Sequence, residues 1–183
     1  MKLPNSVPET DPSALWVLQQ ELLGLAEQLV GKRDGSKRIF QPAFHENGPH
    51  IRNTPFLDGA FVELGSGSKV CWPTAVYEMA HETIHLLNPT VGYTNWLEEG
   101  VAVEFSVHVQ REYGLPIQSP SSGPYSEALE MVRLLPDGVF QAAYRIREVS
   151  GSLSAASFEL LSSLFSGFDL TVLRKLTEQC VPR

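Results

Sequence analysis

The stretch from residue 75 to residue 104 constrains the fold more than any other part of the chain. It reads AVYEMAHETIHLLNPTVGYTNWLEEGVAVE. His81 and His85 are four residues apart, so an α-helix places both imidazoles on the same side. The residues that flank this pair most closely are uncharged, which is typical of a helix buried on most sides. Pro73 and Asn88-Pro89 predict where this helix begins and ends.

The two histidines enclose a pattern with metal chemistry. Two imidazoles on one helix face can bind a single Zn²⁺ at about 2.0–2.1 Å each. Glu82 directly follows His81, so its carboxylate could reach the water that such a metal activates without being a ligand itself. The H-E-x-x-H pattern therefore predicts a zinc site with a carboxylate beside it.

A third ligand is expected downstream, because catalytic zinc usually has three protein ligands and one open position. Residues 95–102 read NWLEEGVA and predict the start of a second helix, with Asn95 as its N-cap. Glu98 then falls at the third helical position, where it can complete a capping box. This favours Glu99 as the zinc ligand, although the spacing leaves Glu98 open as the alternative.

These residues resemble a known family. H-E-x-x-H followed by W-L-x-E-G-x-A resembles the gluzincin metallopeptidases, in particular the branch that contains aminopeptidase N, over residues 76–105. The resemblance implies that the glutamate before the glycine, Glu99, binds zinc together with His81 and His85. It also implies that Glu82 is the general base, and that the chain is a zinc-dependent hydrolase, a protease.

The chain departs from aminopeptidase N in two respects. The interval between His85 and Glu99 is shorter, and the G-x-M-E-N motif of that family is absent. The resemblance therefore extends to a gluzincin-type zinc site and not to aminopeptidase specificity.

Length and charge limit the remaining classes. A chain of 183 residues fits one domain, here a first part (1–114) with the zinc helices and a helical subdomain (115–183). The formal net charge of −7 argues against binding nucleic acid through phosphate neutralisation. The first 16 residues lack the apolar run of a signal peptide, and no window resembles a membrane span. The expectation is a cytoplasmic protein with a peptide or protein substrate.

The expected fold class is α+β. Leucines at steps of three and four predict a helix over residues 12–30, capped by Asp11. Residues 38–44 and 49–55 predict a hairpin around Glu46-Asn47-Gly48, with a third strand at 60–64. The resemblance implies a minimal zincin-like fold, in which residues 61–64 could be the sheet edge that binds substrate as an added strand. An ordinary structural strand is an equal alternative for these residues.

The C-terminal part is expected to be all helical, after a loop rich in proline and serine at 115–124. Helices are predicted near 125–135, 138–149, 155–166 and 169–180, separated by glycine-containing turns. The resemblance implies that a residue of this part stabilises the oxyanion. Tyr125 is nominated for that catalytic role, ahead of Tyr113 and Tyr144, while packing at the edge of the core is the alternative for all three.

Several other polar residues are weaker candidates. Glu104 could accept a hydrogen bond from a zinc-bound histidine and fix its orientation, or it could be a solvent-exposed carboxylate of the helix. His45 and His50 are interpreted as surface or partly buried groups, and His108 as a residue of a helix face. Cys71 could lie near the site but reads better as a small buried side chain.

Two further hypotheses compete with the peptidase. One is a zincin-fold protein that binds a peptide or partner without hydrolysing it, although the intact Glu82 argues against this. The other is a helical protein in which H-E-x-x-H arose by chance. Metal content separates this last hypothesis from the other two.

Overall fold

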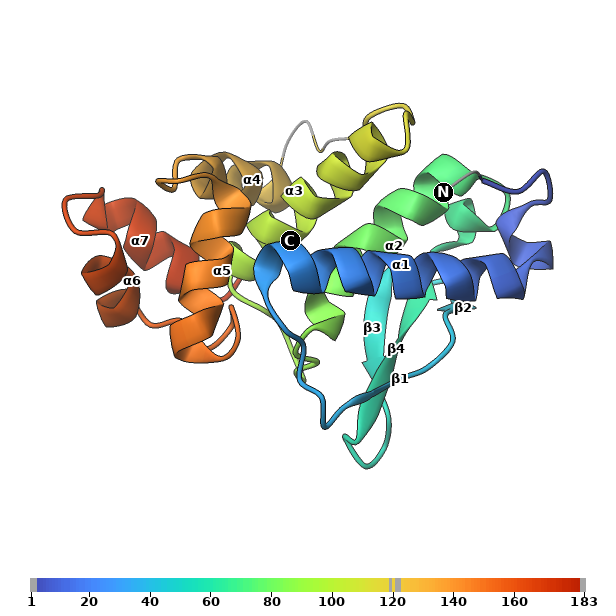
Figure 1. Cartoon of the computed structure of the whole chain (residues 1–183), viewed down its shortest axis with the longest axis horizontal. Helices are drawn as coiled ribbons and strands as arrows, with labels where there is room; N and C mark the ends of the chain where they lie inside the picture. Colours follow the sequence, from blue (N-terminus) through green and yellow to red (C-terminus); the bar gives the residue numbers. More distant parts are fainter. Residues whose placement is uncertain (1–2, 119, 121–122, 182–183) are drawn as a thin grey trace.

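The computed structural model describes residues 3–118, 120 and 123–181. The fold is α+β, with a small sheet and seven α-helices in the described residues. Two of these helices, α2 and α3, lie at the centre and separate the sheet from the C-terminal helices (Figure 1). The elements are β1 (Arg38–Ile39), β2 (Ala43–Phe44), β3 (His50–Asn53), β4 (Gly59–Leu64), α1 (Pro12–Val30), α2 (Trp72–Leu86), α3 (Trp96–Glu112), α4 (Pro124–Arg133), α5 (Val139–Ser150), α6 (Phe158–Leu164) and α7 (Leu170–Thr177).

The helix predicted over residues 12–30 is confirmed as α1. The side chain of Asp11 accepts a hydrogen bond from the backbone N–H of Ala14 at 3.0 Å, which caps the helix. Leu15, Leu18 and Leu22 are buried, as their spacing predicts. Helix α1 thus covers α2 and one end of α5 with its apolar side.

The hairpin predicted between residues 38–44 and 49–55 is wrong. Strands β2 and β3 lie on opposite sides of β4, and β3 forms the hairpin with β4 instead. Gly48 shows why, because a Cβ at this position would lie 2.6 Å from the carbonyl oxygen of Glu63. The backbone therefore crosses the end of β4 at this turn rather than folding back beside β2.

The edge strand expected at residues 61–64 is also wrong. Glu63 pairs with Ala43 in a parallel ladder and with His50 in an antiparallel one. Strand β4 is therefore the central strand, flanked by β3 on one side and by β1 and β2 on the other. The open edge beside the central helices belongs to β3, whose Asn53 side chain donates to the carbonyl of Thr90 at 2.8 Å.

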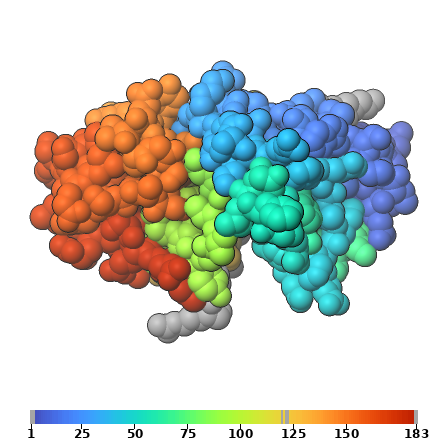
Figure 2. All heavy atoms as spheres, turned by 90° about the horizontal axis from the view of Figure 1, so that it is seen from below, coloured from blue at the N-terminus to red at the C-terminus, as the bar shows by residue number. Residues whose placement is uncertain are grey.

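Helices α2 and α3 pack closely against each other and connect the two ends of the molecule. Pro73 lies in the first turn of α2 and Asn95 caps α3, both as predicted. Gly100 allows α4 to approach α3, because a Cβ there would lie 2.5 Å from the carbonyl oxygen of Ala128. The segment that joins α2 to α3 lies between the sheet and the C-terminal helices (Figure 2).

The four helices expected in the C-terminal part are present as α4 to α7. The chain then returns to the start of α3, where Gln179 pairs with Asn95 in an antiparallel bridge. The backbone N–H of Cys180 donates to the carbonyl of Thr94 at 2.8 Å, and that of Trp96 donates to Glu178 at 3.1 Å. Among the described residues, no helix combines the length and apolarity needed to cross a membrane.

Candidate metal centre

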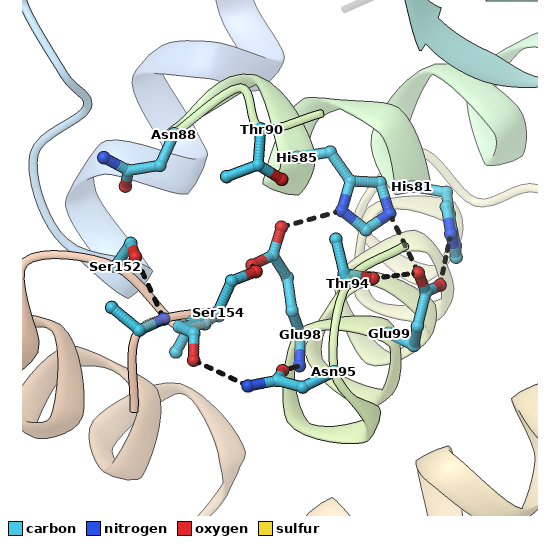
Figure 3. Close-up of polar contacts among 12 residues, drawn as sticks. His81, His85, Asn88, Thr90, Thr94, Asn95, Glu98, Glu99, Ser152 and Ser154 are labelled. Carbon is cyan, nitrogen blue, oxygen red and sulfur yellow. Dashed lines mark hydrogen bonds and ion pairs between the residues drawn. The ribbon is translucent and has the colours of Figure 1, made fainter. Parts of the chain in front are cut away.

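Helices α2 and α3 bring three side chains with metal-binding atoms together. His81 and His85 lie one turn apart on α2, with ring centroids 5.1 Å from each other. Glu99 of α3 faces them, with carboxylate oxygens 3.3 Å from His81 Nε2 and 3.7 Å from His85 Nε2 (Figure 3). One ligand atom from each lies within 4.8 Å of the other two. We call these three residues the His/Glu cluster.

Glu98 orients the second histidine of the cluster. His85 Nδ1 donates to Glu98 Oε1 at 2.9 Å, and the hydroxyl of Ser154 donates to the other oxygen of Glu98. With Nδ1 bonded to Glu98, Nε2 is the ring nitrogen of His85 that faces Glu99 and that could bind a metal after losing its proton. The contacts of Glu98 therefore fix both the tautomer and the direction of this ligand (Figure 3).

This role differs from the capping box predicted for Glu98. The cap itself is as expected, because the Asn95 side chain accepts from the backbone N–H of Glu98 at 2.9 Å. The Glu98 carboxylate turns instead towards His85, where burial leaves it 3% exposed. Sequence reasoning missed this residue, although a charged side chain in the first turn of a buried helix needs a partner.

Glu104, which the sequence nominated for that role, is placed elsewhere. Its carboxylate accepts a hydrogen bond from Arg133 Nε at 2.7 Å and lies 3.9 Å from Arg111. It sits more than one turn beyond Glu99 on α3, on the side that faces α4. The prediction that Glu104 orients a histidine of the cluster is therefore wrong.

The electrostatics of the cluster favour positive charge on His85 beside a negatively charged Glu99. Burial disfavours charge on both His85 and Glu99, but their mutual attraction is stronger. Burial lowers the pKa of His85, yet Glu99, Glu98 and Glu82 outweigh it and raise that pKa to about 10. Burial likewise raises the pKa of Glu99, but His85 and His81 outweigh it and bring the value to about 2.

The two carboxylate oxygens of Glu99 have different partners. Glu99 Oε1 accepts a hydrogen bond from the Thr94 hydroxyl, whereas Glu99 Oε2 is buried and lies 3.3 Å from His81 Nε2. A cation between His81 Nε2 and Glu99 Oε2 would be bound by both atoms. Two imidazoles and one carboxylate are also a common donor set for catalytic zinc.

Glu82 lies next to the cluster on α2 and is only 4% exposed. Its carboxylate makes no hydrogen bond with any residue in the described ranges. Burial raises the pKa of Glu82, while His85 and His81 pull it in the opposite direction. A carboxylate with these properties is a suitable proton acceptor, because a raised pKa brings it closer to neutral pH.

Of the three tyrosines nominated, the fold brings only Tyr125 to the cluster. Its ring meets the ring of His81 edge to face, with centroids 5.6 Å apart, and the side chain remains 37% exposed. Burial, Glu99 and Glu82 all raise the pKa of Tyr125, which keeps its hydroxyl protonated. Tyr113 donates to Glu21 at 3.3 Å, and Tyr144 packs beside Gly31.

The remaining histidines lie outside the cluster. His45 and His50 join Glu63 in a second group of possible ligands, which the sequence did not suggest. Arg52 Nη2 already lies 2.8 Å from Glu63 Oε2, the carboxylate oxygen that also contacts His50. The positive charge of Arg52 therefore competes with any cation there. His108 packs against Phe140 with ring centroids 5.2 Å apart, as expected for a helix-face residue.

Cys71 is only partly buried, so the expectation of a small buried side chain at this position is wrong. Cys71 precedes the first residue of α2, ten residues and about 15 Å along the helix from His81. Cys180, which the sequence did not single out, is buried beside Thr94 through the C-terminal bridge. Only the long-range pairing of residues 178–180 with the start of α3 reveals this position.

No protein-family model, curated protein or solved structure matches this chain. The chemistry of the site follows from its own residues. These are the imidazoles of His81 and His85, the buried carboxylate of Glu99, the buried carboxylate of Glu82 with its raised pKa, and the phenol of Tyr125. Such a set can bind a divalent cation and move a proton beside it.

Proposed function

We propose that the protein is a zinc-dependent peptidase of the gluzincin type, with a zincin-like fold. The observation that carries the proposal is the His/Glu cluster, in which His81, His85 and Glu99 converge while Glu98 fixes the tautomer of His85. Two imidazoles and one carboxylate form a donor set that is common in catalytic zinc sites. Zinc held by this cluster would supply Lewis acidity, which acidifies water and polarises a carbonyl group.

Glu82 is assigned the role of general base. Its position one residue after His81 brings its carboxylate to the same end of the cluster, and burial raises its pKa. It accepts the proton from water as the oxygen attacks the peptide carbonyl carbon. It then delivers that proton to the departing amine nitrogen as the C–N bond breaks.

Tyr125 is assigned to the oxyanion that develops on the attacked carbonyl. The phenol stays protonated because its pKa is raised, so its O–H can donate a hydrogen bond at neutral pH. Its ring contact with His81 holds it at the rim of the cluster, and its exposed fraction leaves the hydroxyl open to a ligand.

Strand β3 is the surface on which the substrate backbone would extend. Strand β4 pairs with one side of β3, and in the described residues no strand pairs with the other side. The link from Asn53 to Thr90 holds this edge against the connection between α2 and α3. An extended peptide added at this edge would bind through main-chain hydrogen bonds.

Replacing the base tests the proposal. Zinc-loaded Glu82→Gln should keep its metal and lose hydrolysis of casein or quenched fluorescent peptides by about 10²–10⁴-fold. Glu104→Gln, which alters a carboxylate away from the cluster, is the matched control and should retain activity. Undiminished turnover by zinc-loaded Glu82→Gln would remove the assigned base. Wild-type protein that binds zinc and peptides but cleaves none would support the non-hydrolytic alternative.

A further inference from the structure

A cavity of about 550 Å³ adjoins the His/Glu cluster on the side of the C-terminal helices. Pro124 and Ser126 line it, and they are the chain neighbours of Tyr125, whose ring meets that of His81. Trp96 of α3 also lines it and lies one helical turn before Glu99. The cavity therefore begins where the candidate site ends, although none of the three ligands lines it.

Two glutamates give this cavity its charge. Glu127 and Glu130 lie three residues apart on α4, so they share one face of the helix and both line the cavity. Both are exposed, and neither side chain makes a hydrogen bond or an ion pair within the described ranges. The lysine of the cavity, Lys175, is paired with Glu178 at 3.1 Å. The charge of Lys175 is thus compensated, whereas those of the two glutamates are not.

Trp96 forms part of the cavity wall. Lys175 Nζ lies 4.4 Å from the centre of the Trp96 ring, and the Trp96 side chain is 7% exposed. The indole N–H itself is buried, so Trp96 contributes its ring and not a donor to the wall of the cavity.

The cavity and the cluster also share an electrostatic environment. Cys180 lies between them, with its backbone bonded to Thr94 and its chain neighbour Val181 in the cavity wall. Burial raises the pKa of Cys180 to about 11, with Glu99 and Glu127 acting in the same direction and Lys175 against them. A glutamate of the cavity and a ligand of the cluster therefore act on the same thiol.

We propose that this cavity is a substrate subsite that binds a cationic group of a peptide, an ammonium or a guanidinium, close to the scissile bond. This inference rests on the peptidase function proposed above and specifies its substrate class. The formal net charge of −7 acts in the same direction, since an acidic protein attracts basic peptides. The cation can come from a lysine or arginine side chain or from a free amino terminus, and both have the same chemistry here.

Matched peptides test the proposal. A quenched fluorescent peptide carries lysine, norleucine or glutamate at each of three positions on either side of the scissile bond, with its amino terminus either free or acetylated. We measure kcat/KM for wild type, the double variant Glu127→Gln/Glu130→Gln and the control Glu148→Gln, which changes an exposed glutamate on α5. The same peptides are titrated by fluorescence anisotropy against zinc-loaded Glu82→Gln, with and without the double substitution.

We expect lysine to exceed norleucine by about two- to fivefold in kcat/KM at one position, a range set by the strength of exposed ion pairs. The preference should disappear in the double variant and persist in Glu148→Gln. If peptides with a free amino terminus are preferred over acetylated ones instead, the bound cation is the amino terminus. Cleavage without charge preference, or a preference that survives the double substitution, would overturn the subsite and leave the peptidase standing. If no peptide is cleaved, the proposed peptidase function is wrong. Equal binding of lysine and norleucine peptides in the anisotropy titration would then overturn the proposed subsite as well.

Discussion

Glu98 and Glu99 are neighbours in the chain but contact different atoms of the histidines. Successive residues of an α-helix point about 100° apart, so one glutamate can face the Nε2 atoms while the other reaches round to His85 Nδ1. The hydroxyl of Ser154, from the loop between α5 and α6, holds the second oxygen of Glu98. Glu99, the proposed ligand, and Glu98, which orients His85, therefore come from one helical turn.

This division predicts distinct effects on zinc affinity. Glu98→Ala should weaken zinc binding by about 10–100-fold without abolishing it, because losing an orienting partner costs that much in comparable sites. Glu98→Gln should lose less, since its amide oxygen can still accept from His85 Nδ1. Competition with a chromophoric chelator measures both, and Glu104→Ala serves as the control. Unchanged affinity in Glu98→Ala would contradict the orienting role.

Tyr125 allows a second prediction at the residue scale. Tyr125→Phe keeps the ring against His81 but removes the hydroxyl, so kcat for peptide hydrolysis should fall by about 10²–10³-fold while KM changes little. Tyr113→Phe, which removes a hydroxyl bonded to Glu21, should leave kcat unchanged. Equal kcat values for wild type and Tyr125→Phe would rule out the hydroxyl as the oxyanion donor.

At the scale of elements, α3 must approach both α2 and α4 closely. Gly100 lies at the contact with α4, where an added Cβ would meet the Ala128 carbonyl oxygen at 2.5 Å. The same residue stands next to Glu99 in the chain, so a displacement of α3 at this point would also move the carboxylate. The small residue after the ligand thus serves helix packing.

The third prediction follows from this contact. Alanine normally stabilises a helix interior relative to glycine by about 1 kcal/mol. At Gly100 the steric conflict should outweigh that gain, so Gly100→Ala should lower the free energy of unfolding by about 1–3 kcal/mol. Gly24→Ala in α1, where nothing lies within 4 Å of the added atom, should raise it by about 0.5–1 kcal/mol. Urea denaturation measures both. Stabilisation by Gly100→Ala would contradict the close approach of α3 and α4.

The accuracy of the sequence-based predictions also varies with the kind of element. The helices and the pairing of His81 with His85 follow from local periodicity, which a short window of sequence contains. Strand pairing is not local, so the hairpin predicted around residues 46–48 was wrong and β4 proved to be central. The partner of Glu98 was missed for the same reason, because His85 and Ser154 are 13 and 56 residues away from it.

At the scale of the whole molecule, the cluster links segments far apart in the chain. The ligands come from α2 and α3, Ser154 comes from the C-terminal helices, and residues 178–180 pair with the start of α3. The buried apolar residues form a core that extends from Leu15 to Cys180. A cation in the cluster should therefore stabilise the entire fold and not only the loop beside it.

The fourth prediction concerns this coupling. Removing zinc with a chelator should lower Tm by about 5–10 °C if the free zinc was about 100 times its Kd. Restoring the metal should reverse the shift. His81→Ala/His85→Ala, which lacks two ligands, should show the same Tm with and without chelator in a thermal scan by circular dichroism. An equal shift in that variant would assign the effect to another site.

The most direct test of the central claim is zinc per chain, measured by elemental analysis in protein purified without added metal. We predict close to one zinc in wild type and in Glu104→Ala, and its loss in Glu99→Ala. We expect no second zinc, because Arg52 already pairs with the carboxylate of the His45, His50 and Glu63 group. Wild-type protein that neither contains zinc nor can be loaded with it would contradict the claim, as would full zinc content in Glu99→Ala.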